Sequence, residues 1–189
     1  TNNEIDALIG QALEYQTRGQ TQESIATYRR ILEAMELPAA RFNLGLLYEQ
    51  ELHFDEAIEQ FRQSVEQDEY RLGSHFALGE CYRAKGRVDE ALEHIVQALK
   101  IVDLGTVKRE QADDLIVLYE NLANSYATKG DQAQAEQFTN SLIEFLSSKG
   151  WEDKVQQVRQ HMEVIKEEGE QVSLVEAIEV HESDRVLEA

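Results

Sequence analysis

The chain has 189 residues, of which 42% are hydrophobic and one is proline, and it carries a formal net charge of −19 at pH 7. The apolar content is enough for a folded core, and the negative charge argues against a nucleic-acid partner, because a phosphate backbone is bound by clustered lysine and arginine. No apolar run approaches the roughly 18 residues of a membrane span, so we expect none. The single Cys81 excludes an internal disulfide and is expected to be a packed or groove-edge thiol and not a nucleophile. We expect an acidic, cytoplasmic protein.

Apolar residues at helical spacing predict paired helices along the first 100 residues and a less regular second half. The predicted helices, in chain order, cover 4–18 and 21–36, 38–51 and 54–68, 71–85 and 88–102, a long helix from an N-cap at Thr106 to about 129, then 132–148 and 151–168. Pro38, at the start of the third helix, lies where a missing backbone donor is harmless. The chain is therefore expected to be all-α.

The same four residue types recur at a fixed period. Gly45, Tyr48, Ala57 and Phe61 return as Gly79, Tyr82, Ala91 and Ile95, each 34 residues later. The set that lies 33 residues before Gly45, Tyr48, Ala57 and Phe61 is Ala12, Tyr15, Ser24 and Tyr28. The set that lies 44 residues after Gly79, Tyr82, Ala91 and Ile95 is Ala123, Tyr126, Ala135 and Thr139. A repeat of this length indicates a stack of like helical hairpins.

This pattern resembles the tetratricopeptide repeat family, in which a small residue and a tyrosine of the first helix precede a turn glycine and a second helix with alanine and an aromatic residue. The turn glycines would be Gly19, Gly86 and Gly130, whereas the second unit has Leu52 there. The resemblance implies a right-handed α-solenoid with a concave face that binds peptides or proteins. We expect a domain over 1–168, made of units at about 5–37, 38–71, 72–103 and 107–148 and a capping helix at 151–168, followed by an acidic tail at 169–189.

The step of 44 residues before the fourth unit indicates ten additional residues, which fall within about 102–114. They are interpreted either as a tolerated extension of the loop or as additional turns of the first helix of that unit, which would then project past its neighbours and shape one end of the groove.

In the family, first helices line the concave face. By that resemblance the partner-binding residues here are Ile9, Leu13, Phe42, Asn43, Leu46, Phe76, Glu80, Arg83, Glu120, Asn121 and Asn124. The phenylalanines would form an apolar wall while asparagines bind a peptide backbone, unless both rings pack between helices and never meet a ligand. The family's clamp for acidic C-terminal tails is not expected, because only Asn43 matches it. The groove should be apolar in its N-terminal half and polar in its C-terminal half.

The tail combines acidic residues with a short aliphatic stretch, "VSLVEAIEV". Its large aliphatic side chains would be poorly accommodated in water, so we expect the tail to dock on the capping helix, in the chain's own groove or on a second copy of the chain. The docking residues would be Val172, Leu174, Val175 and Ile178.

No phosphate loop, nucleophile motif or metal-ligand spacing is present in the sequence, so we expect no enzyme activity, no metal and no cofactor. The main prediction is an interaction scaffold that holds a peptide or helix of a partner in its groove. Alternatives are a chaperone-like assembly factor that shields an apolar client segment, and regulation through the tail. Because the chain begins at Thr1 and not at Met, it could also be the repeat domain of a larger sensor or enzyme.

Overall fold

The computed structural model describes residues 1–163, and every regular element in this part is helical. The elements are α1 (Asn2–Thr17), α2 (Thr21–Ala34), α3 (Pro38–Gln50), α4 (Phe54–Ser64), α5 (Asp68–Ala84), α6 (Val88–Ile101), the 3-10 turns η1 (Leu104–Thr106) and η2 (Arg109–Gln111), α7 (Ala112–Thr128), α8 (Gln132–Ser148) and a last helix over 152–163. Pro38 occupies the first turn of α3, as predicted.

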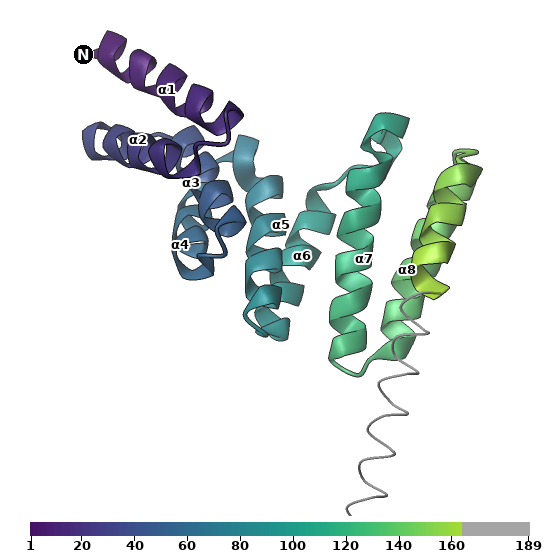
Figure 1. The fold of residues 1–189 in the computed structure, drawn as a ribbon. Helices are drawn as coiled ribbons and strands as arrows, with labels where there is room; N and C mark the ends of the chain where they lie inside the picture. Colours follow the sequence, from purple (N-terminus) through teal and green to yellow (C-terminus); the bar gives the residue numbers. More distant parts are fainter. Residues whose placement is uncertain (164–189) are drawn as a thin grey trace, which may run out of the picture.

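Consecutive helices pack as antiparallel hairpins, and the hairpins follow one another in an open array (Figure 1). Helix α5 also contacts both α3 and α7, so these odd-numbered helices share one face of the stack. Among the described helices α1 makes no such contact with α3, which leaves the first hairpin turned away from the second. The prediction of an all-α stack of helical hairpins is confirmed.

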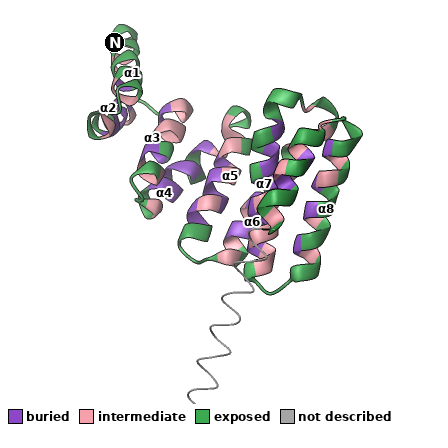
Figure 2. Ribbon diagram, turned by 45° about the vertical axis from the view of Figure 1, so that its right-hand side comes forward, coloured by how far each residue is buried: buried purple, intermediate pink, exposed green. Residues whose placement is uncertain are grey.

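Each hydrophobic core is shared between neighbouring hairpins, so stability depends on contacts between adjacent units. Ile31 of the first hairpin is buried with Leu44 of the second, and Phe61 of the second with Leu78 of the third. Figure 2 shows buried residues along the sides of the helices that face one another. Cys81 lies in one of these cores and is fully buried, as predicted.

The small residues of the repeat allow the two helices of a hairpin to approach closely. A Cβ atom on Gly45 would lie 2.7 Å from the Phe61 ring, and one on Gly79 would lie 2.5 Å from Cγ1 of Ile95. In the first hairpin the equivalent residue is Ala12, whose carbonyl accepts a 2.9 Å hydrogen bond from the buried Ser24 hydroxyl. The recurring small residue is therefore a packing requirement within each unit.

The turns inside the hairpins require a left-handed backbone. Gly19, Gly86 and Gly130 have φ angles of 71°, 73° and 89°, and Leu52, at the same place in the second hairpin, has a φ of 61°. A residue with a β-carbon pays about 1–2 kcal/mol for this conformation. The second hairpin thus has the same left-handed turn as the others, but with a leucine, for which this backbone conformation is unfavourable.

Leu52→Gly is expected to raise the free energy of unfolding by about 1 kcal/mol, because glycine adopts a positive φ without steric cost. The Leu52 side chain is 71% exposed, so little packing is lost. Urea denaturation followed by circular dichroism measures the gain. Leu52→Ala is the control, since it removes the exposed side chain but keeps the strain; an equal gain in both variants would contradict the argument.

The ten additional residues do not lengthen α7, so the prediction of an overhanging helix is wrong. The segment 102–111 forms two 3-10 turns, and α7 begins at Ala112 with 17 residues, as many as α5. Thr106 does not cap a helix; its hydroxyl donates to the Asp103 carbonyl. The physical reason is the burial of apolar side chains. Val102, Leu104 and Val107 pack against the core of the last hairpin, and a straight helix would not bring all three to it.

The last helix covers the end of the stack, as predicted, from residue 152 to the end of the described part. Its Val155 and Val158 are fully buried, and Trp151 packs edge-on against Phe145 at 6.1 Å. Ion pairs Arg109–Asp153 at 2.5 Å and Lys154–Asp113 at 2.7 Å join this helix to the region where α7 begins. The rest of the predicted capping helix and the tail residues Val172, Leu174, Val175 and Ile178 lie outside the described residues.

Candidate functional site

The face shared by the odd-numbered helices carries exposed aliphatic side chains in its N-terminal half. Leu13 of α1 is 48% exposed and Leu46 of α3 is 36% exposed, and they are equivalent residues, 33 positions apart. Ile9, one turn before Leu13, is half-buried against the first core. Each of the first two units thus carries one exposed leucine at the same repeat position, although α1 does not contact α3.

Phe42 and Phe76 lie on this face, but both rings pack between hairpins. The Phe42 ring is 5.8 Å from Phe61 and 5.3 Å from Tyr70, and its Cζ atom would be 2.9 Å from a Cβ on Gly73. Phe76 packs against the core shared by α6 and α7. Each ring is half-buried, so it supports the face while keeping one part accessible.

The asparagines differ in how far they can reach a ligand. Asn121 is only 5% exposed, so its place among the lining residues is not retained. The amide of Asn43 donates 2.8 Å to the Ala39 carbonyl of its own helix. Asn124 is half-buried and lines a small hollow between α7, α8 and the last helix. Of the three asparagines predicted to bind a peptide backbone, only Asn43 and Asn124 are therefore retained.

Two carboxyl groups meet between α3 and α5. Burial raises the pKa of Glu49 to about 8, and the negative charge of Glu80 and a hydrogen bond with it add to the effect. Glu49 therefore carries its proton at neutral pH. Burial, with the charges of Glu49 and Glu80, likewise raises the pKa of the Cys81 thiol to about 12, so this thiol keeps its proton at neutral pH. Glu80 was predicted to lie on the groove; Glu49 was not.

Further acidic groups lie on the C-terminal half of the same face. Glu120 of α7 accepts a 2.8 Å contact from His161 of the last helix, and Asp114 is exposed in the first turn of α7. Arg83, near the end of α5, is exposed and is the one cation among the predicted lining residues. The face is thus predominantly acidic.

An apolar hollow of about 320 Å³ opens between α5, α7 and the segment 102–111. Its lining includes Leu72 and Phe76 of α5, Val107 of the inserted segment, and Leu115 and Val117 of α7. The C-terminal half of the face is therefore not wholly polar, and the sequence prediction on this point is wrong. The sequence did contain a sign of this hollow. Val117 stands 44 residues after Gly73 and so takes the same repeat position, at which the interface between α3 and α5 has a glycine and the interface between α5 and α7 has a valine.

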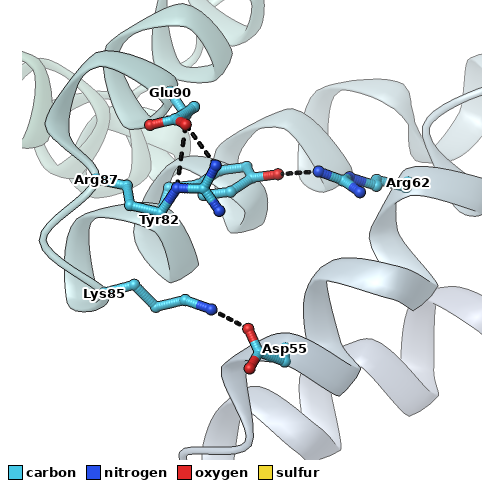
Figure 3. A network of polar contacts seen from close by, with 6 residues as sticks. All are labelled: Asp55, Arg62, Tyr82, Lys85, Arg87 and Glu90. Atoms are coloured by element: carbon cyan, nitrogen blue, oxygen red, sulfur yellow. Dashed lines mark hydrogen bonds and ion pairs between the residues drawn. The ribbon is translucent and has the colours of Figure 1, made fainter.

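Away from this face, a polar network joins the second and third hairpins (Figure 3). The Arg62 guanidinium donates a 2.6 Å hydrogen bond to the Tyr82 hydroxyl, and Arg87 lies 5.1 Å from the centre of the Tyr82 ring. Lys85 also pairs with Asp55. Because Arg62 and Asp55 belong to α4, the network fixes the orientation of adjacent hairpins.

Two histidines that are 19 residues apart meet inside the third hairpin. The Nδ1 atoms of His75 and His94 are 3.1 Å apart, and burial lowers the pKa of both rings. The same two repeat positions hold Arg41 and Gln60 in the second hairpin, joined by a 3.0 Å hydrogen bond. The histidine pair therefore occupies a recurring polar contact of the fold.

Within residues 1–163 no group of three or more His, Cys, Asp or Glu side chains could hold a metal ion. In the same part of the chain, no helix combines the length and the apolar character that crossing a membrane would require.

Comparisons with known proteins agree with this geometry. A family model described as a tetratricopeptide repeat matches residues 9–71 and 42–103, together 95 of the 189 residues. No curated protein matches the chain.

Solved structures resemble the chain over most of its length. The crystal structure of MamA has a TM-score of 0.67 at 17% identity, covering 79% of this chain and 82% of MamA. A MamA fragment from Desulfovibrio magneticus RS-1 gives 0.66 at 14% identity and covers 76% of each chain. YrrB, described as a TPR protein with an unusual peptide-binding site, gives 0.61 at 21% identity, covering 75% of this chain and 68% of YrrB. At these identities the likeness shows the fold, a right-handed solenoid of helical hairpins.

Proposed function

Because the chain belongs to the tetratricopeptide repeat family, we propose that it is a non-catalytic scaffold whose concave face binds a peptide or helix of a partner protein. The observation that carries this proposal is the exposure of equivalent leucines on consecutive first helices, Leu13 and Leu46, together with the carboxyl pair of Glu49 and Glu80 between α3 and α5. An amphipathic segment can place apolar residues at regular intervals against such leucines.

The acidic character of the face supports a partner that carries basic residues. Glu80, Glu120 and Asp114 are acidic, Arg83 is the one cation among the predicted lining residues, and Glu120 also contacts His161. Opposite charges across an interface accelerate association and exclude partners of the wrong sign. The description of YrrB as a peptide-binding protein of the same fold supports a peptide-binding role as well.

Leu46→Asp tests the proposal. Full-length protein is used to select binders from a phage-displayed library of random 12-residue peptides, and the enriched peptides are synthesised and measured by fluorescence polarisation. We expect Leu46→Asp to weaken their binding at least tenfold, which is about 1.4 kcal/mol, because an exposed anchor at the centre of the face is replaced by a charge.

Met35→Asp is the matched control, since Met35 is 42% exposed and lies at the end of α2, outside the concave face. Binding that is unchanged by Leu46→Asp and by Leu13→Asp would place the peptide site elsewhere and overturn the proposal. A library from which no peptide is enriched would overturn it too.

A further inference from the structure

We propose that the apolar hollow between α5, α7 and the inserted segment 102–111 is an anchor pocket for one large apolar side chain of the partner, next to a lysine or arginine of the same partner segment. This inference rests on the proposed function and names the feature that the partner must carry. The hollow measures about 320 Å³, within the range of pockets that hold ligands.

The pocket lies where two equivalent interfaces of the stack have different residues. Between α3 and α5, Gly73 has no side chain, so the Phe42 ring fills the space above it. Between α5 and α7 the equivalent residue is Val117, 44 positions later, and α5 packs less extensively on α7 than on α3. Here the Phe76 ring packs against the core shared by α6 and α7, and a hollow lined by Phe76 and Val117 remains.

The inserted segment supplies the third wall. Val102 and Val107 line the hollow while both also pack against the core of the last hairpin, which holds the segment in place. A regular 34-residue repeat would lack this wall, because the additional ten residues form it. The pocket is therefore a property of this chain and not of the repeat pattern in general.

The walls leave apolar surface in contact with solvent. Leu72 is 38% exposed and Val117 is 43% exposed, and they face the hollow from opposite helices. Burying such side chains under a partner's apolar group releases about 25 cal/mol for each Å² removed from water. An apolar side chain is accordingly the group that gains most from entering.

The charge at the rim of the hollow indicates which residue of the partner should stand next to the apolar side chain. Asp114 is the one charged residue among those lining the hollow, and it has no ion pair within the described residues. Of the two cations in the segment 102–111, Arg109 pairs with Asp153, and Lys108 is exposed and does not line the hollow. A basic residue of the partner would therefore meet an available carboxylate at the rim.

The same charge argues against the chain's own tail as the occupant. Residues 170–189 contain six acidic residues and one arginine, so docking there would bring like charges toward Asp114 on a chain whose net charge is already −19. The proposal therefore commits to a basic partner segment, and docking of the tail becomes an outcome of the test.

The test measures full-length protein against four synthetic 12-residue peptides with one central residue, leucine or alanine, between flanking lysines or flanking glutamates. The leucine–lysine peptide is expected to bind at least tenfold more tightly than each of the other three. Val117→Gln should remove that advantage, because a polar group then enters the apolar wall. Ile101→Gln is the control, since Ile101 is also 43% exposed and does not line the hollow.

Charge reversal gives the second readout. Asp114→Lys should weaken binding of the lysine-flanked leucine peptide at least threefold and strengthen binding of the glutamate-flanked one. Glu110→Lys makes the same charge change outside the lining, and the protein should still prefer the lysine-flanked peptide. Lysine-flanked binding that survives Val117→Gln but is lost in Leu46→Asp would overturn the pocket and leave the groove function standing.

Two other outcomes overturn the proposal. If all four peptides fail to bind although library-selected peptides bind the groove, the pocket does not accept this chemistry. If Leu174→Gln together with Ile178→Gln in the full chain raises peptide affinity tenfold while Asp114→Lys has no effect, the tail is the occupant.

Discussion

Gly79→Ala is expected to lower the free energy of unfolding by about 2 kcal/mol, the largest loss we expect from a single added methyl group in this chain. The new Cβ would lie 2.5 Å from Cγ1 and 3.2 Å from Cδ1 of Ile95, and 3.3 Å from the Ala91 carbonyl oxygen. Cγ1 is close to the backbone of a fully buried side chain, so it cannot swing away, and α5 and α6 must separate. This strain exceeds the roughly 1 kcal/mol by which alanine favours a helix over glycine.

Gly10→Ala is the matched control for this experiment. Gly10 is also inside a helix, α1, but a Cβ there would meet nothing within 4 Å. The same substitution should therefore stabilise the protein by about 0.5–1 kcal/mol. Urea denaturation monitored by circular dichroism separates the two directions.

A double-mutant cycle attributes the loss to one contact. In an Ile95→Ala background the Cγ1 atom is absent, so Gly79→Ala should cost about 1 kcal/mol or less. A Gly79→Ala variant that is as stable as the parent protein would mean that small residues at this repeat position are not required for close helix approach.

The regular part of this fold follows from the sequence because each unit repeats the same local requirement. The positions of Gly45, Ala57 and Phe61 predict which side chains touch, and they recur at Gly79, Ala91 and Ile95 with the same contacts. Pairing is between sequence neighbours, so no long-range register has to be guessed. Helix α3, for example, begins at Pro38 as the sequence predicts.

The inserted segment could not be predicted in the same way because it occurs once. Its length is compatible both with added helical turns and with a loop, and helix propensity does not distinguish them. Tertiary packing distinguishes them. Val102, Leu104 and Val107 pack against the last hairpin, and the segment that carries them forms two 3-10 turns. The apolar hollow was missed for the same reason.

The candidate site was partly predictable. The exposure of Leu13 and Leu46 follows from their place in the repeat, whereas the burial of Asn121 and the pairing of Glu49 with Glu80 depend on how neighbouring hairpins are oriented. Glu49 and Glu80 are 31 residues apart, and neither belongs to a motif. Partner binding by these residues stays a prediction until it is measured.

Replacing Glu49 by glutamine is expected to stabilise the protein at alkaline pH and to leave it nearly unchanged at pH 5. Burial and the charge of Glu80 raise the pKa of Glu49 from 4.5 to about 8 in the folded chain. The folded state then binds more protons than the unfolded state between these values, so stability falls as pH rises through this window and levels off above it. Glutamine is a neutral side chain of the same shape and removes this proton dependence.

Screening by solvent limits the size of the effect. A pKa difference of that size corresponds to at most about 5 kcal/mol, and because Glu49 is only partly buried we expect about 1–2 kcal/mol between pH 5 and pH 9. The measurement compares the unfolding free energies of the parent and Glu49→Gln at both pH values. Glu144→Gln removes an exposed carboxylate on α8 and is the control for the loss of one negative charge.

Glu80→Gln distinguishes the causes of the shift. It removes the neighbouring charge but leaves Glu49 buried, so stability should still fall toward pH 9, by less than in the parent. If the pH dependence were unchanged by Glu49→Gln, Glu49 would not be the buried carboxyl group that causes it, and the packing of α3 against α5 around Glu49 and Glu80 would have to differ from this structure. A basic side chain bound between them should release the Glu49 proton, so occupation of this part of the groove is expected to remove the same pH dependence.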